Sequence, residues 1–388
     1  MKIGYLTTYD VWNRSTWPKT QVGICGAGQY LAKTLEEQAM PLDYIGPLAE
    51  KLPLQSKLKW HLYRQLLGRD YYPFTEPSVL QAYADQILGK LSGNDLDIVL
   101  CPENAIPIAY LDYQQPIVLW TDAPLASSVN FYPWLSNLCN ETKQGLYAME
   151  KAAFDRCELI IFLSDWAAEM AVNIYEIHPS KMRVIPWGAN IECDRTSEDI
   201  ENMINARNIS PCKLLFIGID WFRKGGNVAF QVAQELNQRG LETELTVMGC
   251  NPFIEEVPPS FVRILGFVNK YSELGRTQMN QLFSESHFLI LPSTADFSPH
   301  VLCEANSFGL PCLTTDVGGI PTLIKNDLNG KTFSAQASIS EYCDYITHLI
   351  KPYQHYKELA MSSFNEYQSR LNWSVAAKSL KRLLTDLL

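Results

Sequence analysis

The sequence lacks most of the features that mark metal, membrane and nucleic-acid proteins. Its 10 cysteines stand singly, without a CxxC pair or a cysteine–histidine spacing typical of zinc, so we expect reduced core cysteines, a cytoplasmic location and no bound metal. No window reaches the roughly 18 apolar residues that cross a bilayer. The formal net charge of -10 opposes binding to nucleic-acid phosphates, so no nucleic-acid partner is expected.

The chain is rich in short apolar runs that alternate with helix-length segments. This alternation predicts an α/β fold with parallel sheets. The predicted strands of the first half are 3–7, 42–45, 98–101, 117–120, 159–163 and 184–185, and those of the second half are 213–217, 244–248, 262–265, 288–291 and 311–314.

The 388 residues exceed the size at which a single core stops growing, which predicts two domains. The stretch 188–211 is polar and contains no strong strand pattern, so a hinge is expected there. The predicted domains are therefore 1–188 and 189–388, facing each other across a cleft.

A glycine-containing loop with two cations follows the strand at 213–217. The loop begins at Gly218 and carries Arg223 and Lys224 just before a predicted helix start. Two fixed cations at a helix entrance can neutralise a departing diphosphate without a metal ion. Taken alone, the pair would fit a solvated turn better than a phosphate site.

Two carboxylates follow the strand at 288–291. Asp296 is predicted to lie in the loop and Glu304 on the helix that begins in between. Backbone amides at a helix start attract anions, and a carboxylate on the first helical turns can accept both hydroxyls of a ribose. The intervening residues are Phe297, Ser298, Pro299, His300, Val301 and Leu302.

Together with the segment 316–321, these stretches resemble the retaining glycosyltransferases of family 4, which have the GT-B fold of two Rossmann-like domains. The resemblance implies transfer of a sugar from a UDP- or GDP-type nucleotide diphosphate sugar to a hydroxyl of a glycan, lipid-linked or small-molecule acceptor. It also implies retention of anomeric configuration, with neither metal nor cofactor. The alternatives are another GT-B sugar-nucleotide enzyme, such as an epimerase or phosphorylase, and a non-catalytic nucleotide-binding Rossmann protein.

The resemblance also implies roles for single residues. Arg223 and Lys224 would bind the donor diphosphate, Glu304 the ribose and Asp296 the transferred sugar, while the amides of residues 297–302 would hold sugar and phosphate. Asp296 departs from the family pattern, because a longer glutamate usually stands there. Thr322 is a second departure, where the family often has glutamate.

The first half carries the acceptor side of this prediction. Gly26 and Gly28 lie where a helix is expected to open, and their amides are predicted to approach the diphosphate, although a tight turn would explain them equally well. Asp122 follows the strand at 117–120 and matches the family's histidine or aspartate that contacts sugar or acceptor. A helix-capping role is the alternative for Asp122.

Two further segments have a predicted place. Residues 51–69 form a basic amphipathic helix in an acidic chain, which favours an ordinary surface helix and leaves peripheral contact with the inner face of a membrane as the alternative. The last helix, at about 373–388, is expected to return to the N-terminal domain.

Overall fold

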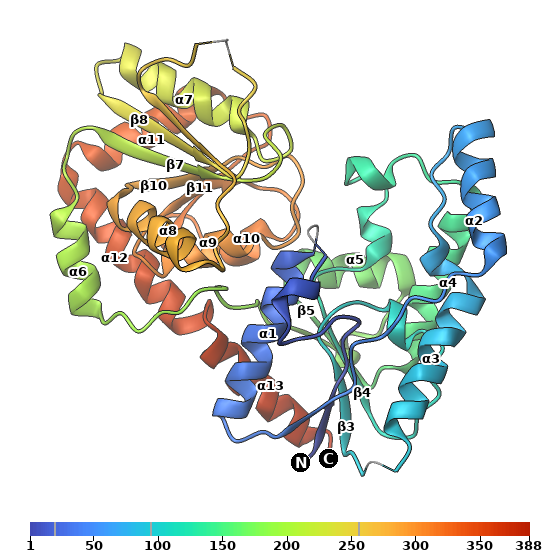
Figure 1. Cartoon of the computed structure of the whole chain (residues 1–388). Coiled ribbons are helices and arrows are strands. Elements are labelled where there is room, and N and C mark those ends of the chain that lie inside the picture. The colour runs from blue at the N-terminus through green and yellow to red at the C-terminus, as the bar shows by residue number, and fades with distance from the viewer. Residues whose placement is uncertain (19–20, 94, 255–256) are drawn as a thin grey trace. The chain divides into compact units, whose positions relative to one another are not determined.

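The computed structural model describes residues 1–18, 21–93, 95–254 and 257–388. The chain forms two compact units, of which the first contains Met1–Trp187 and Trp373–Leu388 and the second contains Gly188–Asn372 (Figure 1). The chain therefore leaves the first unit once, forms the whole second unit, and returns. In the part of the chain that the structure describes, no helix is long and apolar enough to span a membrane.

The first unit is built on a parallel sheet with the strand order β2-β1-β3-β4-β5-β6. Its strands are β1 (Ile3–Tyr5), β2 (Leu42–Tyr44), β3 (Ile98–Cys101), β4 (Ile117–Thr121), β5 (Leu159–Phe162) and β6 (Met182–Val184). Its helices are α1 (Val22–Glu37), α2 (Leu54–His61), α3 (Pro77–Leu91), α4 (Asn140–Arg156), α5 (Asp165–Tyr175) and α13 (Trp373–Asp386). Figure 1 shows α13 packed beside α1.

The second unit repeats the plan with the strand order β12-β11-β10-β7-β8-β9. Its strands are β7 (Cys212–Ile217), β8 (Thr243–Met248), β9 (Val262–Gly266), β10 (Phe288–Leu291), β11 (Cys312–Thr315) and β12 (Gly330–Phe333). Its helices are α6 (Ser197–Ala206), α7 (Gly226–Gln238), α8 (Glu273–Glu285), α9 (His300–Asn306), α10 (Ile320–Leu323), α11 (Ile339–Ile350) and α12 (Tyr353–Arg370). Helices α7 and α11 lie on one face of this sheet and α8 and α9 on the other (Figure 1).

The predicted α/β class is confirmed, and most strands lie where the apolar runs placed them. Strands β3, β4, β5, β10 and β11 are buried along their whole length, because helices cover both faces of a parallel sheet. The edge strand β12 was not predicted. It contains Lys331 and Thr332, which are half-buried, so it has no continuous apolar run.

In each sheet the strand order reverses at one point, between β1 and β3 in the first unit and between β7 and β10 in the second. Loops that leave neighbouring strands at such a point run to opposite faces of the sheet. Ligands of open parallel sheets bind at the carboxyl ends of the strands at this point. In the second unit, a ligand is therefore expected at the loops after β7 and β10.

A buried arginine ties the helices of the second unit together. Arg207 follows α6, and its guanidinium donates to the carbonyl oxygens of Ser284 at 3.0 Å, Gly309 at 2.7 Å and Phe308 at 2.7 Å. It also donates to the hydroxyl of Tyr356 on α12 at 2.6 Å. A buried cation is stable only when its donors are satisfied, and here neutral oxygens satisfy them.

A single glycine sets how closely the loops after β7 and β10 approach. Gly225 caps α7 with a left-handed φ of 78°, and a Cβ atom there would lie 2.0 Å from the carbonyl oxygen of Pro292. Just beside it, the amide of Thr294 donates to the carbonyl of Arg223 at 2.8 Å. The two strand-end loops are thus in direct backbone contact, which any larger residue at 225 would disturb.

We expect Gly225→Ala to lower the free energy of unfolding more than the matched change Gly240→Ala. Gly240 has nearly the same φ, 79°, but no atom lies within 4 Å of a Cβ built there. Both variants lose about 1 to 2 kcal/mol for the left-handed backbone. Gly225→Ala adds about 1 to 3 kcal/mol for the collision with Pro292. Urea denaturation measures both, and equal losses would contradict the close approach.

Candidate active site

The two predicted cations lie in the loop after β7, and both side chains are largely removed from solvent. The exposed fraction is 19% for Arg223 and 12% for Lys224. A Cβ atom at Gly218 would stand 2.9 Å from Cγ of Lys224, so this glycine leaves room for the lysine side chain. Asp220 shapes the turn by accepting from the amide of Arg223 at 3.0 Å.

Asp296, in the loop after β10, meets both cations. Its carboxylate forms a salt bridge with the ammonium of Lys224 and lies 3.7 Å from the guanidinium of Arg223. Ser293 donates to the same carboxylate at 3.0 Å, and Arg223 also donates to the carbonyl of Ala295 at 2.8 Å. The structure therefore brings Arg223, Lys224 and Asp296 together at the point where the strand order reverses.

Glu304 lies on α9 and has a partner that the sequence did not suggest. Lys270, in the loop between β9 and α8, places its Nζ 2.7 Å from Oε1 of Glu304. The carboxylate is only 3% exposed, so this pair is largely shielded from water. Lys270 follows β9, and its position after a strand could have marked it as a candidate site residue. The sequence alone does not show that its side chain reaches Glu304.

His300, the first residue of α9, lies close to both charged pairs. Its pKa is lowered to about 4, mainly by burial and to a lesser extent by the nearby Lys270, while Glu304 opposes the shift. Its Nδ1 lies 3.4 Å from the carbonyl oxygen of Gly188. His300 is therefore a neutral side chain at neutral pH and contributes no positive charge to the site.

The remaining residues between Asp296 and Glu304 differ in what they can offer a ligand. Phe297 is buried, and the Oγ of Ser298 is shielded without a hydrogen-bond partner, as is typical of a group that a water or ligand satisfies. Pro299 caps α9 and has no amide hydrogen. Val301 is half-buried, and the amide of Leu302 already donates to the carbonyl of Pro299 at 3.0 Å. The predicted use of the Leu302 and Pro299 amides is therefore wrong.

The two glycines predicted to expose amides lie inside a helix. Gly26 and Gly28 are buried residues of α1, which begins at Val22, and both lie beyond the four amides that a helix start leaves free. A Cβ atom at Gly28 would be 1.9 Å from the hydroxyl oxygen of Tyr9, and its carbonyl accepts from Tyr5 at 2.6 Å. The prediction of exposed amides at these positions is wrong, and packing explains Gly28.

Asp122 directly follows β4 in the first unit, as predicted, and its Oδ1 is shielded from solvent. The other predicted catalytic residues, Arg223, Lys224, Asp296 and Glu304, all belong to the second unit. Within the described ranges, no group of three or more histidine, cysteine, aspartate or glutamate side chains could hold a metal ion.

The part of the chain that carries this cluster is similar to known glycosyltransferases. Residues 211–352, which include the whole cluster around Asp296 and Glu304, match the family model of group 1 glycosyl transferases. A UDP-Gal:alpha-D-GlcNAc-diphosphoundecaprenol alpha-1,3-galactosyltransferase from Escherichia coli is 22% identical over 177 residues, which is 44% of this chain and 46% of that protein. The chain thus spans about half the length of this curated relative.

Solved structures match over the full length. Sucrose-phosphate synthase from Thermosynechococcus elongatus has a TM-score of 0.67 at 13% identity, covering 100% of this chain and 98% of that one. HepE from Anabaena in complex with UDP has a TM-score of 0.62 at 15% identity, covering 100% of both chains. The fold is GT-B. The likeness to glycosyltransferases and the GT-B fold, both predicted from the sequence, are confirmed.

We expect His300→Gln to weaken the dependence of stability on pH. Because the folded pKa of about 4 is below the ordinary 6.5, the unfolded chain takes up a proton first, and stability is lost as the pH falls between these values. Urea denaturation at about pH 7 and about pH 4.5 measures the loss. The control is His348→Gln, at an exposed position on α11. The same loss in wild type and His300→Gln would contradict a buried neutral histidine.

Proposed function

We propose that this protein is a retaining glycosyltransferase of family 4 that takes its sugar from a nucleotide diphosphate sugar of the UDP or GDP type. The observation that carries the proposal is the meeting of Arg223, Lys224 and Asp296 at the carboxyl ends of β7 and β10, where open parallel sheets bind ligands. The UDP-bound HepE structure and the UDP-Gal-dependent relative support a uridine nucleotide. The acceptor is a hydroxyl group of a glycan, a lipid-linked sugar or a small molecule.

The salt bridges of the free site suggest how the donor is received. A diphosphate carries more negative charge than one carboxylate, so it can displace Asp296 from Lys224 and Arg223. The released carboxylate of Asp296 then accepts hydrogen bonds from hydroxyls of the transferred sugar. Both cations are already held in place, so little side-chain ordering is needed when the donor binds.

Glu304 and Lys270 supply the second half of the donor site. The Glu304 carboxylate accepts hydrogen bonds from the ribose hydroxyls, and Lys270 holds it in a fixed orientation in a shielded position. The Oγ of Ser298 and the amides of His300 and Val301 at the start of α9 are the remaining groups that can donate to sugar or phosphate.

The reaction needs the nucleophile and the leaving group on the same face of the sugar. The bond between the anomeric carbon and the phosphate oxygen breaks, and its electron pair leaves with the diphosphate that Arg223 and Lys224 stabilise. The acceptor oxygen bonds to the anomeric carbon from that face, and its proton passes to the departing phosphate. Because Arg223 and Lys224 neutralise the leaving group, a metal ion is not required. In this proposal Asp122 orients a sugar hydroxyl.

We expect Glu304→Ala to weaken binding of the nucleotide sugar roughly ten- to a hundred-fold, because hydrogen bonds to a charged acceptor are lost. Isothermal titration calorimetry with UDP- and GDP-sugars measures the effect, and circular dichroism checks the fold. Glu285→Ala is the matched control. Glu285 lies on α8 of the same unit, and its carboxylate is 3.4 Å from the ammonium of Lys213. Unchanged donor affinity in a folded Glu304→Ala variant would refute the assignment.

We expect transfer in the presence of EDTA to give a product with the anomeric configuration of the donor, because Arg223 and Lys224 replace a metal and the leaving phosphate takes the proton. Asp122→Asn should lower the rate and leave the anomer unchanged. Nuclear magnetic resonance of the new glycosidic bond measures the outcome. An inverted product would make Asp122 a general base, whereas activity lost with EDTA and restored by magnesium would contradict metal-independent transfer.

A further inference from the structure

Helix α2 and the π-helical turn that follows it, Leu62–Leu66, present their apolar side to solvent. The leucines at 54, 58, 62 and 66 recur at every fourth position, and their exposed fractions are 74%, 64%, 47% and 75%. Residues four apart lie on the same side of a helix. A surface helix ordinarily turns its apolar stripe to the core, so this segment is reversed.

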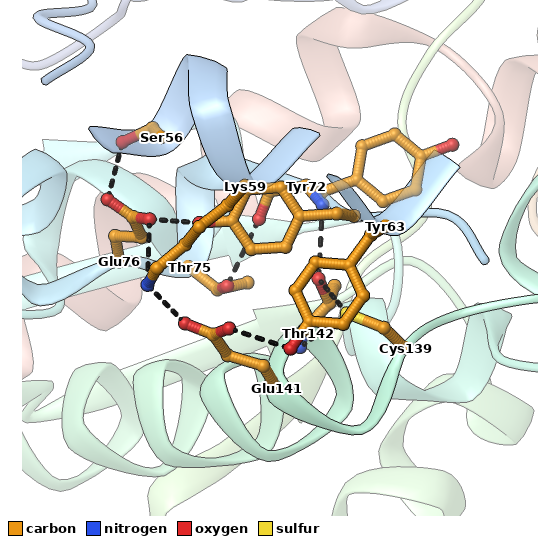
Figure 2. Close-up of polar contacts among 10 residues, drawn as sticks. Ser56, Lys59, Tyr63, Tyr72, Thr75, Glu76, Cys139, Glu141 and Thr142 are labelled. Carbon is orange, nitrogen blue, oxygen red and sulfur yellow. Dashed lines mark hydrogen bonds and ion pairs between the residues drawn. The ribbon is translucent and has the colours of Figure 1, made fainter. Parts of the chain in front are cut away.

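The polar side of the same segment is fixed to the protein. Ser56 is buried and donates to Glu76 at 2.6 Å, and Lys59 lies 3.4 Å from Glu76 and 2.5 Å from Glu141 (Figure 2). One turn later, the hydroxyl of Tyr63 donates to Glu141 at 3.1 Å. Figure 2 shows these contacts converging beneath the helix.

The acceptors of these contacts are themselves held at helix starts. Glu76 directly precedes the first residue of α3 and Glu141 lies in the first turn of α4, where the helix dipole favours a carboxylate. Tyr71 donates to Glu76 and stacks on Tyr63 with ring centroids 5.4 Å apart. Rolling the segment over to bury its leucines would break these charge-assisted contacts, so the leucines stay outside.

The exposed side is also basic. Residues 51–69 contain no aspartate or glutamate, although the chain has a net charge of -10. Lys51, Lys57, Arg64 and Arg69 are exposed, and the Arg64 guanidinium lies over the Trp60 ring at 5.2 Å from its centroid. A second copy of this surface would oppose it with like charge. The combination of exposed leucines and flanking cations is complementary to a bilayer of anionic lipid.

We propose that α2 and the turn 62–66 dock on an anionic lipid bilayer. The exposed leucines enter the boundary between headgroups and acyl chains, while Lys57 and Arg64 contact lipid phosphates. The contacts of Lys59 and Ser56 with the two glutamates keep the segment in this orientation. This inference stands on the first unit alone and does not depend on the proposed transfer reaction.

The test is sedimentation of the full chain with vesicles of phosphatidylcholine alone or with added phosphatidylglycerol. Binding is expected only with the anionic lipid and should weaken as salt is raised. Leu58→Gln combined with Leu66→Gln should reduce partitioning at least about tenfold. The control Leu274→Gln changes a leucine that is 80% exposed on α8, and it should leave partitioning unchanged.

A second pair of substitutions tests the cations. Lys57→Gln combined with Arg64→Gln should reduce partitioning into anionic vesicles roughly 30-fold, at about fivefold per cation. Its control is Lys378→Gln combined with Arg382→Gln, two exposed cations on α13. The proposal would be overturned if the protein did not bind anionic vesicles, or if the control variants lost as much binding as the test variants. It would also be overturned by a concentration-dependent dimer that the leucine changes abolish. Donor binding, measured in parallel, should be unchanged in all these variants, which separates this proposal from the donor-site assignment.

Discussion

The cluster of Arg223, Lys224 and Asp296 depends on one close backbone approach, between the loop after β7 and the loop after β10. That approach requires residue 225 to have no Cβ atom, because the carbonyl of Pro292 occupies the space. Once the loops touch, Arg223 reaches the carbonyl of Ala295 and Lys224 reaches Asp296. The chemistry of the site thus follows from a steric condition at the reversal of strand order.

The same cluster keeps its charges paired. Lys224 and Arg223 share Asp296, and Lys270 neutralises Glu304, so that these shielded side chains have partners of opposite charge. Unpaired charges in such positions would be costly to bury. Any anionic ligand of these cations must replace their internal partners, and the energy of breaking those ion pairs lowers its net affinity.

The sequence correctly predicted the strands that consist of continuous apolar runs and the polar residues that follow a strand. Strands β3 and β10 were placed to the residue, and Asp296 follows its strand as expected. The predictions that failed concern packing between residues far apart in the sequence. Nothing local indicates that Tyr9 fills the space beside Gly28, or that Lys270 pairs with Glu304 across 34 positions.

The reversed α2 illustrates the same limit. Its amphipathic pattern was evident from residues 51–69, but a pattern alone does not say which side is attached to the protein. That depends on Glu76 and Glu141, which come from helices that start later in the chain. Likewise, β12 forms because β11 offers an unpaired edge, even though its own residues are polar.

The placement of α13 in the first unit has a consequence for how the protein is made. The Trp373 ring lies against Trp120 and Trp187, with centroids 6.4 Å and 6.3 Å apart, although Trp373 is synthesised much later than either. The second unit is continuous in sequence and has all its residues once Asn372 leaves the ribosome. The first unit, begun earlier, is completed last, so the side of α1 that packs against α13 stays uncovered until this helix has been made.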